Sequence, residues 1–300
     1  MPSGNVWSAG GNLATGRANL AGAGSLAAGL SMGGNAAGTG SVKTEEYAGD
    51  SHAWSAGGDM GTARMNLAGA GTQDAGLCMG GYRNYPAPWA SNDTEEYTGA
   101  TNTWAAGGSL GTARDYLAGA GTQAAGLCMG GRPGYDNTVY STRTEEYDGA
   151  ANTWANGGNL GTGRRASAGA GTQAAGLSMG GQVGPYYNPS DSNRTEEYDG
   201  GANTWANGGN LGTARNDLAG AGTQDAGLCM GGYTGSQSNR TEEYDGAAWA
   251  NGNNLGTARN GLAGAGVVTA GLCMGGSSNT KTEEYLPPLS DFINVIMWWD

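Results

Sequence analysis

The chain repeats one motif six times along its 300 residues, and this repetition restricts the possible folds more than any other feature. The motif runs from Thr-Glu-Glu-Tyr through a Trp, a Gly-Thr-(Ala/Gly)-Arg element and an Ala-Gly-Ala-Gly stretch to Met-Gly-Gly. Its tyrosines are Tyr47, Tyr97, Tyr147, Tyr198, Tyr244 and Tyr285, and its tryptophans are Trp7, Trp54, Trp104, Trp154, Trp205 and Trp249. A repeat of about 50 residues is one supersecondary unit that is stable only against its neighbours. We therefore expect one domain over residues 1–285, followed by a tail over residues 286–300.

The charge of the chain argues against two classes of partner. Charged residues make up 13% of the sequence, and the formal net charge is −12. Binding to a nucleic-acid backbone or an anionic membrane surface needs clustered Lys and Arg, whereas Lys43 and Lys281 are the only lysines. No apolar run approaches the roughly 20 residues of a spanning helix, and the N-terminal residues do not read as a secretory signal. We expect neither a nucleic-acid partner nor membrane insertion.

Glycine supplies 61 residues, a share that can mark a disordered chain. Here the glycines keep register with Tyr, Trp, Leu and Met, which favours an ordered fold with closely packed strands. The cysteines Cys78, Cys128, Cys229 and Cys273 share one repeat position, where two repeats carry Ser31 and Ser178. Equivalent positions of successive repeats are too far apart for a disulfide, so we expect small, buried, unpaired thiols.

One repeat contains four short segments bounded by turn residues. In the third repeat these are residues 114–123, 125–131, 143–147 and 153–157, separated by Gly- and Asn-rich breaks. Short strands at this spacing predict an all-β fold. Four antiparallel strands per repeat form the blade of a β-propeller.

The repeat resembles the kelch family, in which a Gly-Gly pair is followed by a Tyr and then a Trp. Gly130, Gly131, Tyr147 and Trp154 form one instance, and the resemblance covers roughly residues 5–285. It implies a propeller. The chain begins with a Trp segment that lacks a preceding Thr-Glu-Glu-Tyr and ends with a Thr-Glu-Glu-Tyr that lacks a following Trp. We expect six blades, the last closed by joining the N- and C-terminal strands, with a β-solenoid as the rival fold.

Every glutamate lies in a Thr-Glu-Glu triplet, which occurs six times. Sixfold repetition argues against catalysis, since an active site occurs once. Strand alternation sends Glu145 and Glu146 to opposite faces, so one Glu per repeat can pair with an Arg equivalent to Arg114. A calcium site is the minor alternative. His52 is the only histidine, so a His-rich metal site and a conventional triad have few residues to use. We expect no metal, no cofactor and no enzymatic activity.

Sequence variation concentrates in the connections between the second and third strands, at residues 35–43, 82–93, 132–143, 182–194, 233–240 and 277–281. All of them are expected on one face of the propeller. Their aromatic residues are Tyr82, Tyr85, Trp89, Tyr135, Tyr140, Tyr186, Tyr187 and Tyr233. Loops on a rigid scaffold commonly carry binding sites, and aromatic rings suit sugar stacking or protein contact. The alternative is an ordinary surface whose aromatics pack on the propeller itself.

The C-terminal tail breaks the repeat and is apolar. It contains the only phenylalanine, Phe292, with Ile293, Ile296, Trp298 and Trp299. Left in solvent, such residues form an exposed apolar patch. The tail is therefore a candidate docking or assembly segment, and packing against its own propeller is the alternative.

The near-identical repeats also resemble the kelch-type tandem arrays of marine bacteriophages, especially cyanophage virion proteins. This resemblance implies a non-enzymatic tail fibre, adhesin or capsid-attached component, located in the virion and assembled in the host cytoplasm. Its implied partners are other virion proteins, copies of itself or host surface glycans. A secreted or cell-surface lectin-like propeller is the second hypothesis, and a sugar oxidase or epimerase is the third.

Overall fold

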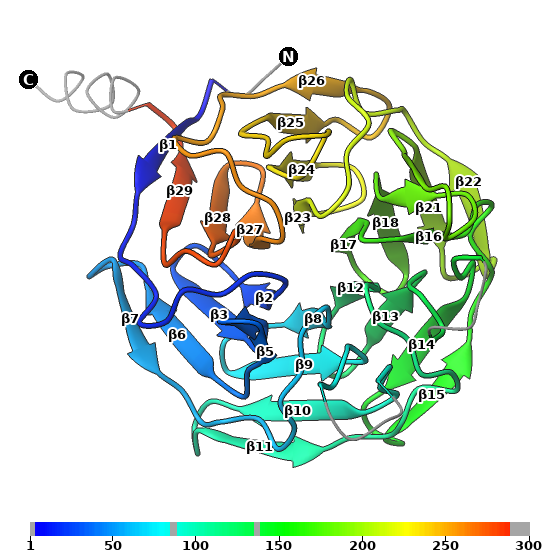
Figure 1. The fold of residues 1–300 in the computed structure, drawn as a ribbon, viewed down its shortest axis with the longest axis horizontal. Coiled ribbons are helices and arrows are strands. Elements are labelled where there is room, and N and C mark those ends of the chain that lie inside the picture. Colours follow the sequence, from blue (N-terminus) through cyan, green and yellow to red (C-terminus); the bar gives the residue numbers. More distant parts are fainter. Residues whose placement is uncertain (1–3, 85–88, 135–138, 289–300) are drawn as a thin grey trace, which may run out of the picture.

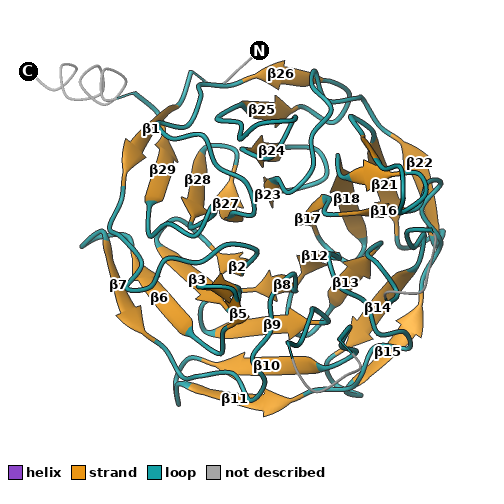
Figure 2. Ribbon diagram, viewed as in Figure 1, coloured by secondary structure: helices purple, strands orange, loops and turns teal. Residues whose placement is uncertain are grey.

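A computed structural model describes residues 4–84, 89–134 and 139–288. Within these residues the chain forms strands and turns without a helix (Figure 2). No helix long and apolar enough to cross a membrane occurs in this part of the chain. The all-β prediction is confirmed.

The described strands form six four-stranded antiparallel sheets. In each sheet the strand order follows the repeat, with the Ala-Gly-Ala-Gly strand innermost and the Trp strand outermost (Figure 1). Five sheets use consecutive repeat strands: β2 (Ala21–Gly24), β3 (Ala28–Met32), β6 (Thr44–Ala48) and β7 (Ala53–Ala56); β8 (Ala68–Gly71), β9 (Ala75–Met79), β10 (Thr94–Thr98) and β11 (Thr103–Ala106); β12 (Ala118–Gly121), β13 (Gly126–Met129), β14 (Thr144–Asp148) and β15 (Thr153–Asn156); β17 (Ala168–Gly171), β18 (Ala175–Met179), β21 (Thr195–Asp199) and β22 (Thr204–Asn207); β23 (Ala219–Gly222), β24 (Gly227–Met230), β25 (Thr241–Tyr244) and β26 (Trp249–Asn251).

The remaining four-stranded sheet combines the two ends of the described chain, and we call it the composite sheet. It contains β27 (Ala263–Val267), β28 (Ala270–Met274), β29 (Thr282–Leu286) and β1 (Val6–Ala9). Trp7 of β1 lies opposite Tyr285 of β29, the same register that pairs Tyr147 with Trp154. Short strands in the variable loops, and one that pairs with them, complete the list: β4 (Asn35–Ala36), β5 (Thr39–Gly40), β19 (Gln182–Val183) and β20 (Ser190–Asp191) lie in the loops, and β16 (Arg164–Arg165) pairs with β19.

The sheets stand around a central axis, as in a β-propeller (Figure 1). This radial arrangement excludes the β-solenoid. Glycine in the two inner strands of each sheet allows neighbouring sheets to approach closely: a Cβ at Gly119 of β12 would lie 2.7 Å from the carbonyl oxygen of Gly69, and one at Gly126 of β13 would lie 2.5 Å from Cδ2 of Leu77. Alanine at either position would clash with the neighbouring sheet. Packing of the two inner strands therefore accounts for these repeat glycines.

The hydrophobic core lies between neighbouring sheets. In one cluster, Leu77 and Met79 pack against Leu117, Cys128 and Tyr147 of the next sheet, all of them buried. The repeat tyrosines are buried, and each packs on the tryptophan of its own sheet with ring centroids 4.8–5.0 Å apart. The repeat Tyr and Trp residues thus belong to the core and its edge, as their position in the motif predicts.

Polar groups of the repeat also connect neighbouring sheets. The Trp154 indole Nε1 donates to Thr94 Oγ1 at 2.9 Å, and the Tyr147 hydroxyl donates to Glu96 Oε1 at 2.7 Å. Gln123 Nε2 donates to the carbonyl oxygens of Gly76 and Tyr97. Because every partner lies in the preceding sheet, each repeat is fastened to its neighbour at several points.

The other glutamate of each triplet pairs with a fully buried arginine that precedes the innermost strand of the same sheet. Arg215 Nη2 lies 2.7 Å from Glu242 Oε1, and Arg215 Nη1 donates to the carbonyl oxygens of Gly231 and Arg240. The backbone N–H of Gly212 donates to Glu242 Oε2 at 2.6 Å. All six repeats contain this ion pair. The prediction that one glutamate of each triplet pairs with an arginine is confirmed.

The four cysteines are buried and unpaired. In three repeats the sulfur accepts a hydrogen bond from the buried arginine, as Cys128 does from Arg114, and in the first repeat Ser31 accepts the equivalent bond from Arg17. Desolvation raises the pKa of each thiol to about 12, with the paired glutamate adding to the rise and the arginine opposing it. The thiolate, the reactive form, is therefore disfavoured.

We expect the native protein to resist thiol labelling. In 5,5′-dithiobis(2-nitrobenzoate) at pH 8, the folded chain should release no thionitrobenzoate on the time scale on which the urea-unfolded chain titrates all of its cysteines. A Cys128→Ser variant should remain folded, since Ser31 and Ser178 occupy the same repeat position. Rapid labelling of even one thiol before unfolding would contradict the packing described.

Candidate ligand-binding site

Six residues around the axis form a cyclic chain of backbone hydrogen bonds on the face that carries the variable loops, which we call the loop face. Each lies two positions after a buried repeat arginine, and each donates its N–H to the carbonyl oxygen of the equivalent residue in the preceding sheet, at 2.6–2.9 Å. The six are Asn19, Asn66, Tyr116, Ala166, Asp217 and Gly261. All have φ between 49° and 61°, the left-handed region that favours Gly and Asn. Tyr116 and Ala166 occupy it at a cost of about 1–2 kcal/mol each.

These axial positions also vary in sequence, although the arginine two positions before each of them is constant and the residue after each axial position is leucine in five of the six repeats. The residue between the arginine and the axial position varies as well, from Met65 and Asp115 to Arg165. Variation inside an otherwise fixed motif indicates positions that the scaffold does not determine. The axial positions were not predicted as site residues, although their variation is visible when the repeats are compared.

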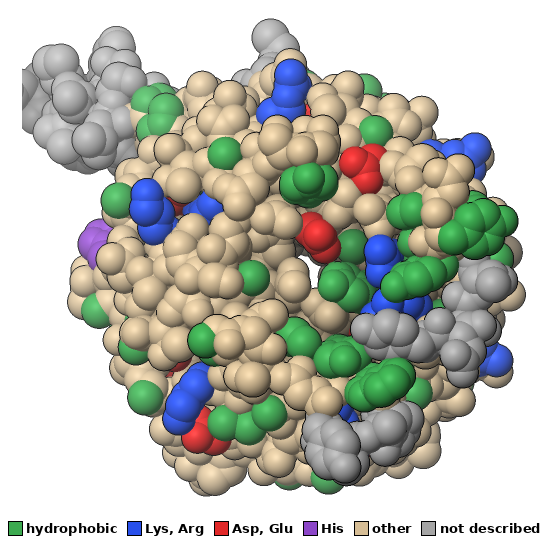
Figure 3. Space-filling model, viewed as in Figure 1, with side chains coloured by type: hydrophobic (Ala, Val, Ile, Leu, Met, Phe, Trp, Pro, Cys, Tyr) green, Lys and Arg blue, Asp and Glu red, His purple; other side chains and the backbone are tan. Residues whose placement is uncertain are grey.

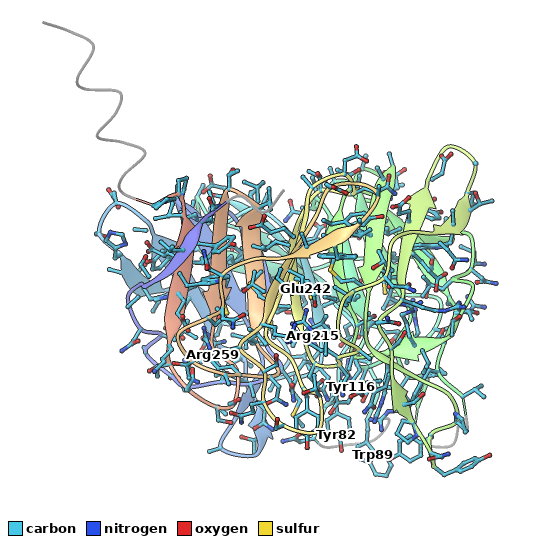
Figure 4. The ribbon with its side chains drawn as sticks, turned by 90° about the horizontal axis from the view of Figure 1, so that it is seen from above. Tyr82, Trp89, Tyr116, Arg215, Glu242 and Arg259 are labelled. Atoms are coloured by element: carbon cyan, nitrogen blue, oxygen red, sulfur yellow. The ribbon has the colours of Figure 1, made fainter. Side chains whose placement is uncertain are left out.

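A pocket of about 360 Å³ lies beside the axis on the loop face. Its wall contains three aromatic rings, two arginines and three asparagines: Tyr82, Tyr116, Tyr186, Arg132, Arg165, Asn19, Asn35 and Asn66, together with Met65. Figure 3 shows hydrophobic side chains gathered on this face, next to Lys and Arg side chains near the axis. In Figure 4, Tyr82, Trp89 and Tyr116 lie at one end of the molecule, while Arg215 and Glu242 lie in its interior. The pocket is thus separate from the buried ion pairs.

The two arginines of the pocket are held by different partners. Arg132, which is 5% exposed, donates to both carboxylate oxygens of Asp115, from Nε at 2.9 Å and from Nη2 at 2.5 Å. Arg165 donates from Nε and Nη2 to Gln182 Oε1 at 3.1 and 2.9 Å. Bidentate geometry fixes the plane of the Arg132 guanidinium and neutralises its charge. Arg165 instead has a neutral hydrogen-bond partner.

Aromatic rings surround Arg165 on several sides. Its guanidinium carbon lies 5.2 Å from the ring centroid of Tyr116, 5.0 Å from that of Tyr140 and 5.6 Å from that of Tyr186. These distances are within the range of cation–π attraction. The contacts hold the tyrosines and Arg165 in one rigid group before any ligand is present, which lowers the entropic cost of binding.

The predicted aromatic residues have different environments. Tyr82 and Tyr186 line the pocket. Trp89, Tyr187 and Tyr233 lie on the loop face with exposed fractions of 42%, 80% and 38%. Tyr140 is only 5% exposed and supports Arg165 from behind, so its ring is not available for contact, contrary to the prediction. Tyr85, Tyr135 and the tail residues Phe292, Ile293, Ile296, Trp298 and Trp299 lie outside the described residues.

Burial shifts the pKa values of two titratable groups at the axis toward their neutral forms. Burial raises the pKa of Asp217 to about 6, with Asp191 adding to the rise and Arg165 opposing it. Burial, followed by the charges of Asp217 and Asp115, raises the pKa of Tyr116 to about 12. The Tyr116 phenol therefore keeps its proton at neutral pH and can donate a hydrogen bond.

Replacing Asp217 with asparagine should stabilise the protein at neutral pH by about 1–2 kcal/mol. The folded state binds the carboxyl proton more tightly than the unfolded state, so the stability that protonation gives at low pH is lost as the pH rises from about 4 to about 6. Asparagine already occupies the equivalent positions 19 and 66 with the same φ. Urea unfolding should show that the variant has a higher free energy of unfolding than the wild type at pH 7 and that this difference shrinks at pH 4. A difference that does not depend on pH would refute this account. Asp59→Asn, at an exposed side chain, is the control.

Comparison with known proteins shows similarity of fold alone. No protein-family model matches the chain, and no curated protein matches it. Among solved structures, the one titled "Structure of YjhT" superposes with a TM-score of 0.74 at 12% sequence identity, covering 91% of this chain and 95% of that chain. At such low identity the similarity supports the β-propeller architecture and leaves the ligand to be argued from the site.

Proposed function

We propose that the chain is a non-enzymatic recognition protein that binds a surface glycan through the loop-face pocket. The observation that carries this proposal is the rigid group of Tyr116, Tyr186 and Arg165 beside a 360 Å³ cavity. Aromatic faces bind the C–H faces of a sugar ring, while Asn and Arg side chains hydrogen-bond its hydroxyls. A few fixed polar groups in a largely preformed pocket are typical of small-ligand sites.

We infer further that the six sheets act as the blades of one closed, kelch-type ring. The register of β1 on β29 and the cyclic hydrogen bonds at the axis support this inference. So does the Tyr47 hydroxyl, which donates across the junction to Glu284 of the composite sheet, as each repeat tyrosine does to the glutamate before it. A closed ring keeps the loop face rigid, and rigidity preserves the geometry of the pocket.

For the biological setting we propose a host-attachment component of a phage particle, on the basis of the resemblance of the repeats to cyanophage virion proteins. Other virion proteins and host glycans are then its partners, and the virion is its location. A secreted or cell-surface lectin-like propeller is the alternative, and it would use the same pocket. Mass spectrometry of purified particles distinguishes the two settings, because only a virion component co-purifies in a fixed ratio to the capsid protein.

Binding is tested with a glycan array probed by the purified full-length protein and two neighbouring variants. Tyr186→Ala removes a ring that lines the pocket, whereas Tyr187→Ala removes one that is 80% exposed and does not line it. For the best array ligand, Tyr186→Ala should weaken binding about tenfold and Tyr187→Ala by less than about twofold. Equal effects of the two variants, or no glycan bound by the folded wild type, would refute the proposal.

A further inference from the structure

A second pocket, of about 420 Å³, lies on the face opposite the loops, at the junction between the composite sheet and the sheet of β2, β3, β6 and β7. Its apolar lining comes from Leu26, Ala27, Val267, Ala270 and Leu286. His52 and Glu284 form a polar edge, with His52 Nδ1 2.6 Å from Glu284 Oε1. We call this cavity the junction pocket.

The junction pocket exists because the repeat changes where the chain begins and ends. In four repeats a glutamine fastens its turn to the preceding sheet, as Gln73 does by donating to the carbonyl oxygens of Gly29 and Tyr47. Leu26 occupies the equivalent position at the junction and can make no such bond. Where the third, fourth and fifth repeats have Asp after the motif tyrosine, the chain here has Leu286. Polar residues of the repeat are therefore replaced by apolar ones around a single cavity.

Exposed hydrophobic side chains also occur near the junction pocket. Large hydrophobic side chains that are exposed within the described residues lie on the loop face, with two exceptions, Val6 at 42% and Val267 at 45%. Both belong to the composite sheet, and Val6 lies opposite Leu286 in the β1–β29 pairing. Val267 replaces the threonine found in four repeats. This exposed apolar surface lies on the composite sheet, beside the junction pocket, and calls for a specific occupant.

The position of the chain end identifies that occupant. Leu286 is both the last residue of β29 and part of the pocket wall, and only Pro287 and Pro288 follow within the described residues. Residues 289–300 carry the most apolar segment of the sequence, with Phe292 six positions after Leu286. Six residues can span roughly 20 Å, enough for the chain to turn back. A segment tethered this closely competes at a high effective concentration against any separate molecule.

We propose that the C-terminal segment, residues 289–300, docks in the junction pocket of its own chain. Aromatic and aliphatic side chains of the segment cover Leu26, Val267 and Leu286. Docking across the junction between the first strands and the last would reinforce the place where the two chain ends meet. This proposal does not depend on glycan binding.

Limited proteolysis of the full-length protein with chymotrypsin tests the proposal, since the segment offers Phe292, Met297, Trp298 and Trp299 as cleavage sites. Leu26→Gln restores the residue of four other repeats and should accelerate cleavage of the segment about tenfold, because cleavage follows the population of the undocked state. Val267→Thr, also a return to the repeat, should act in the same direction. Gln73→Leu at another junction is the matched control and should leave the cleavage rate unchanged.

Mass spectrometry locates the cuts, and circular dichroism verifies that each variant is folded. Equal cleavage rates in the wild type and both junction variants would overturn the proposal. Protection of the segment from chymotrypsin that disappears on dilution, together with a dimer in size-exclusion chromatography, would also overturn the proposal. The occupant of the pocket would then be the segment of a second copy. Protection independent of concentration and lost in the junction variants is the expected result.

Discussion

Replacing Arg215 with methionine should lower the free energy of unfolding by about 3–5 kcal/mol, because it leaves a buried carboxylate without its counter-charge. Arg215 is fully buried, and its guanidinium contacts Glu242 at 2.7 Å, two backbone carbonyl oxygens and the sulfur of Cys229. Glu242 accepts hydrogen bonds from Arg215 and from the backbone N–H of Gly212, and only the bond from Gly212 remains after the substitution. The loss should be similar in every repeat, since each contains the same ion pair.

Equilibrium unfolding in urea measures this loss. The control is Lys43→Met, which removes an ion pair whose partners, Lys43 and Asp59, have side chains 56% and 47% exposed. An exposed pair contributes at most about 1 kcal/mol. A change below about 1 kcal/mol for Arg215→Met would mean that the buried pairs do not hold the strands of a sheet together.

Replacing Trp7 with alanine should destabilise the protein by about 2–4 kcal/mol, as much as the same change at Trp249. The two tryptophans have equivalent surroundings. Trp7 lies 4.8 Å from the ring of Tyr285 and donates to Thr241 Oγ1 at 2.9 Å; Trp249 lies 4.9 Å from Tyr244 and donates to Thr195 Oγ1 at 2.9 Å. They differ in connectivity, since only Trp7 reaches its sheet from the other end of the chain.

This comparison tests closure of the ring by β1. If β1 completes the composite sheet in solution, thermal or urea unfolding should give equal losses for Trp7→Ala and Trp249→Ala, to within about 1 kcal/mol. If Trp7→Ala costs nothing while Trp249→Ala is destabilising, the N-terminal strand is not docked. The matched environments remove burial and hydrogen bonding as explanations for a difference.

Much of the fold was predictable because the same sequence motif occurs six times. One copy of the Tyr–Trp pair is a weak signal, but six copies in register determine the strand boundaries of each repeat. The third repeat illustrates this: β12 to β15 fall within or at the edges of the four segments predicted for it. Strand alternation also separated the roles of Glu145 and Glu146, since Glu145 pairs with Arg114 and Glu146 accepts the Tyr198 hydroxyl of the next sheet.

The candidate site was less predictable because it depends on contacts between repeats. Tyr140 and Tyr186 have similar loop settings in the sequence, yet one is buried under Arg165 and the other is 40% exposed. Tyr116 was assigned to a strand, whereas it lies at the axis in a left-handed conformation. Alternation along a strand predicts which side chains share a face within one repeat. The pocket brings together residues of several repeats, and their contacts do not follow from that pattern.

The most direct test of the central claim is a crystal or cryo-electron-microscopy structure of the protein with its best glycan from the array. We predict ligand density on the loop face between Tyr82, Tyr116 and Tyr186, with sugar hydroxyls within hydrogen-bond distance of Arg165 or Asn66. Density in the junction pocket, on another surface, or nowhere at saturating ligand would contradict the assignment of the loop face as the recognition surface.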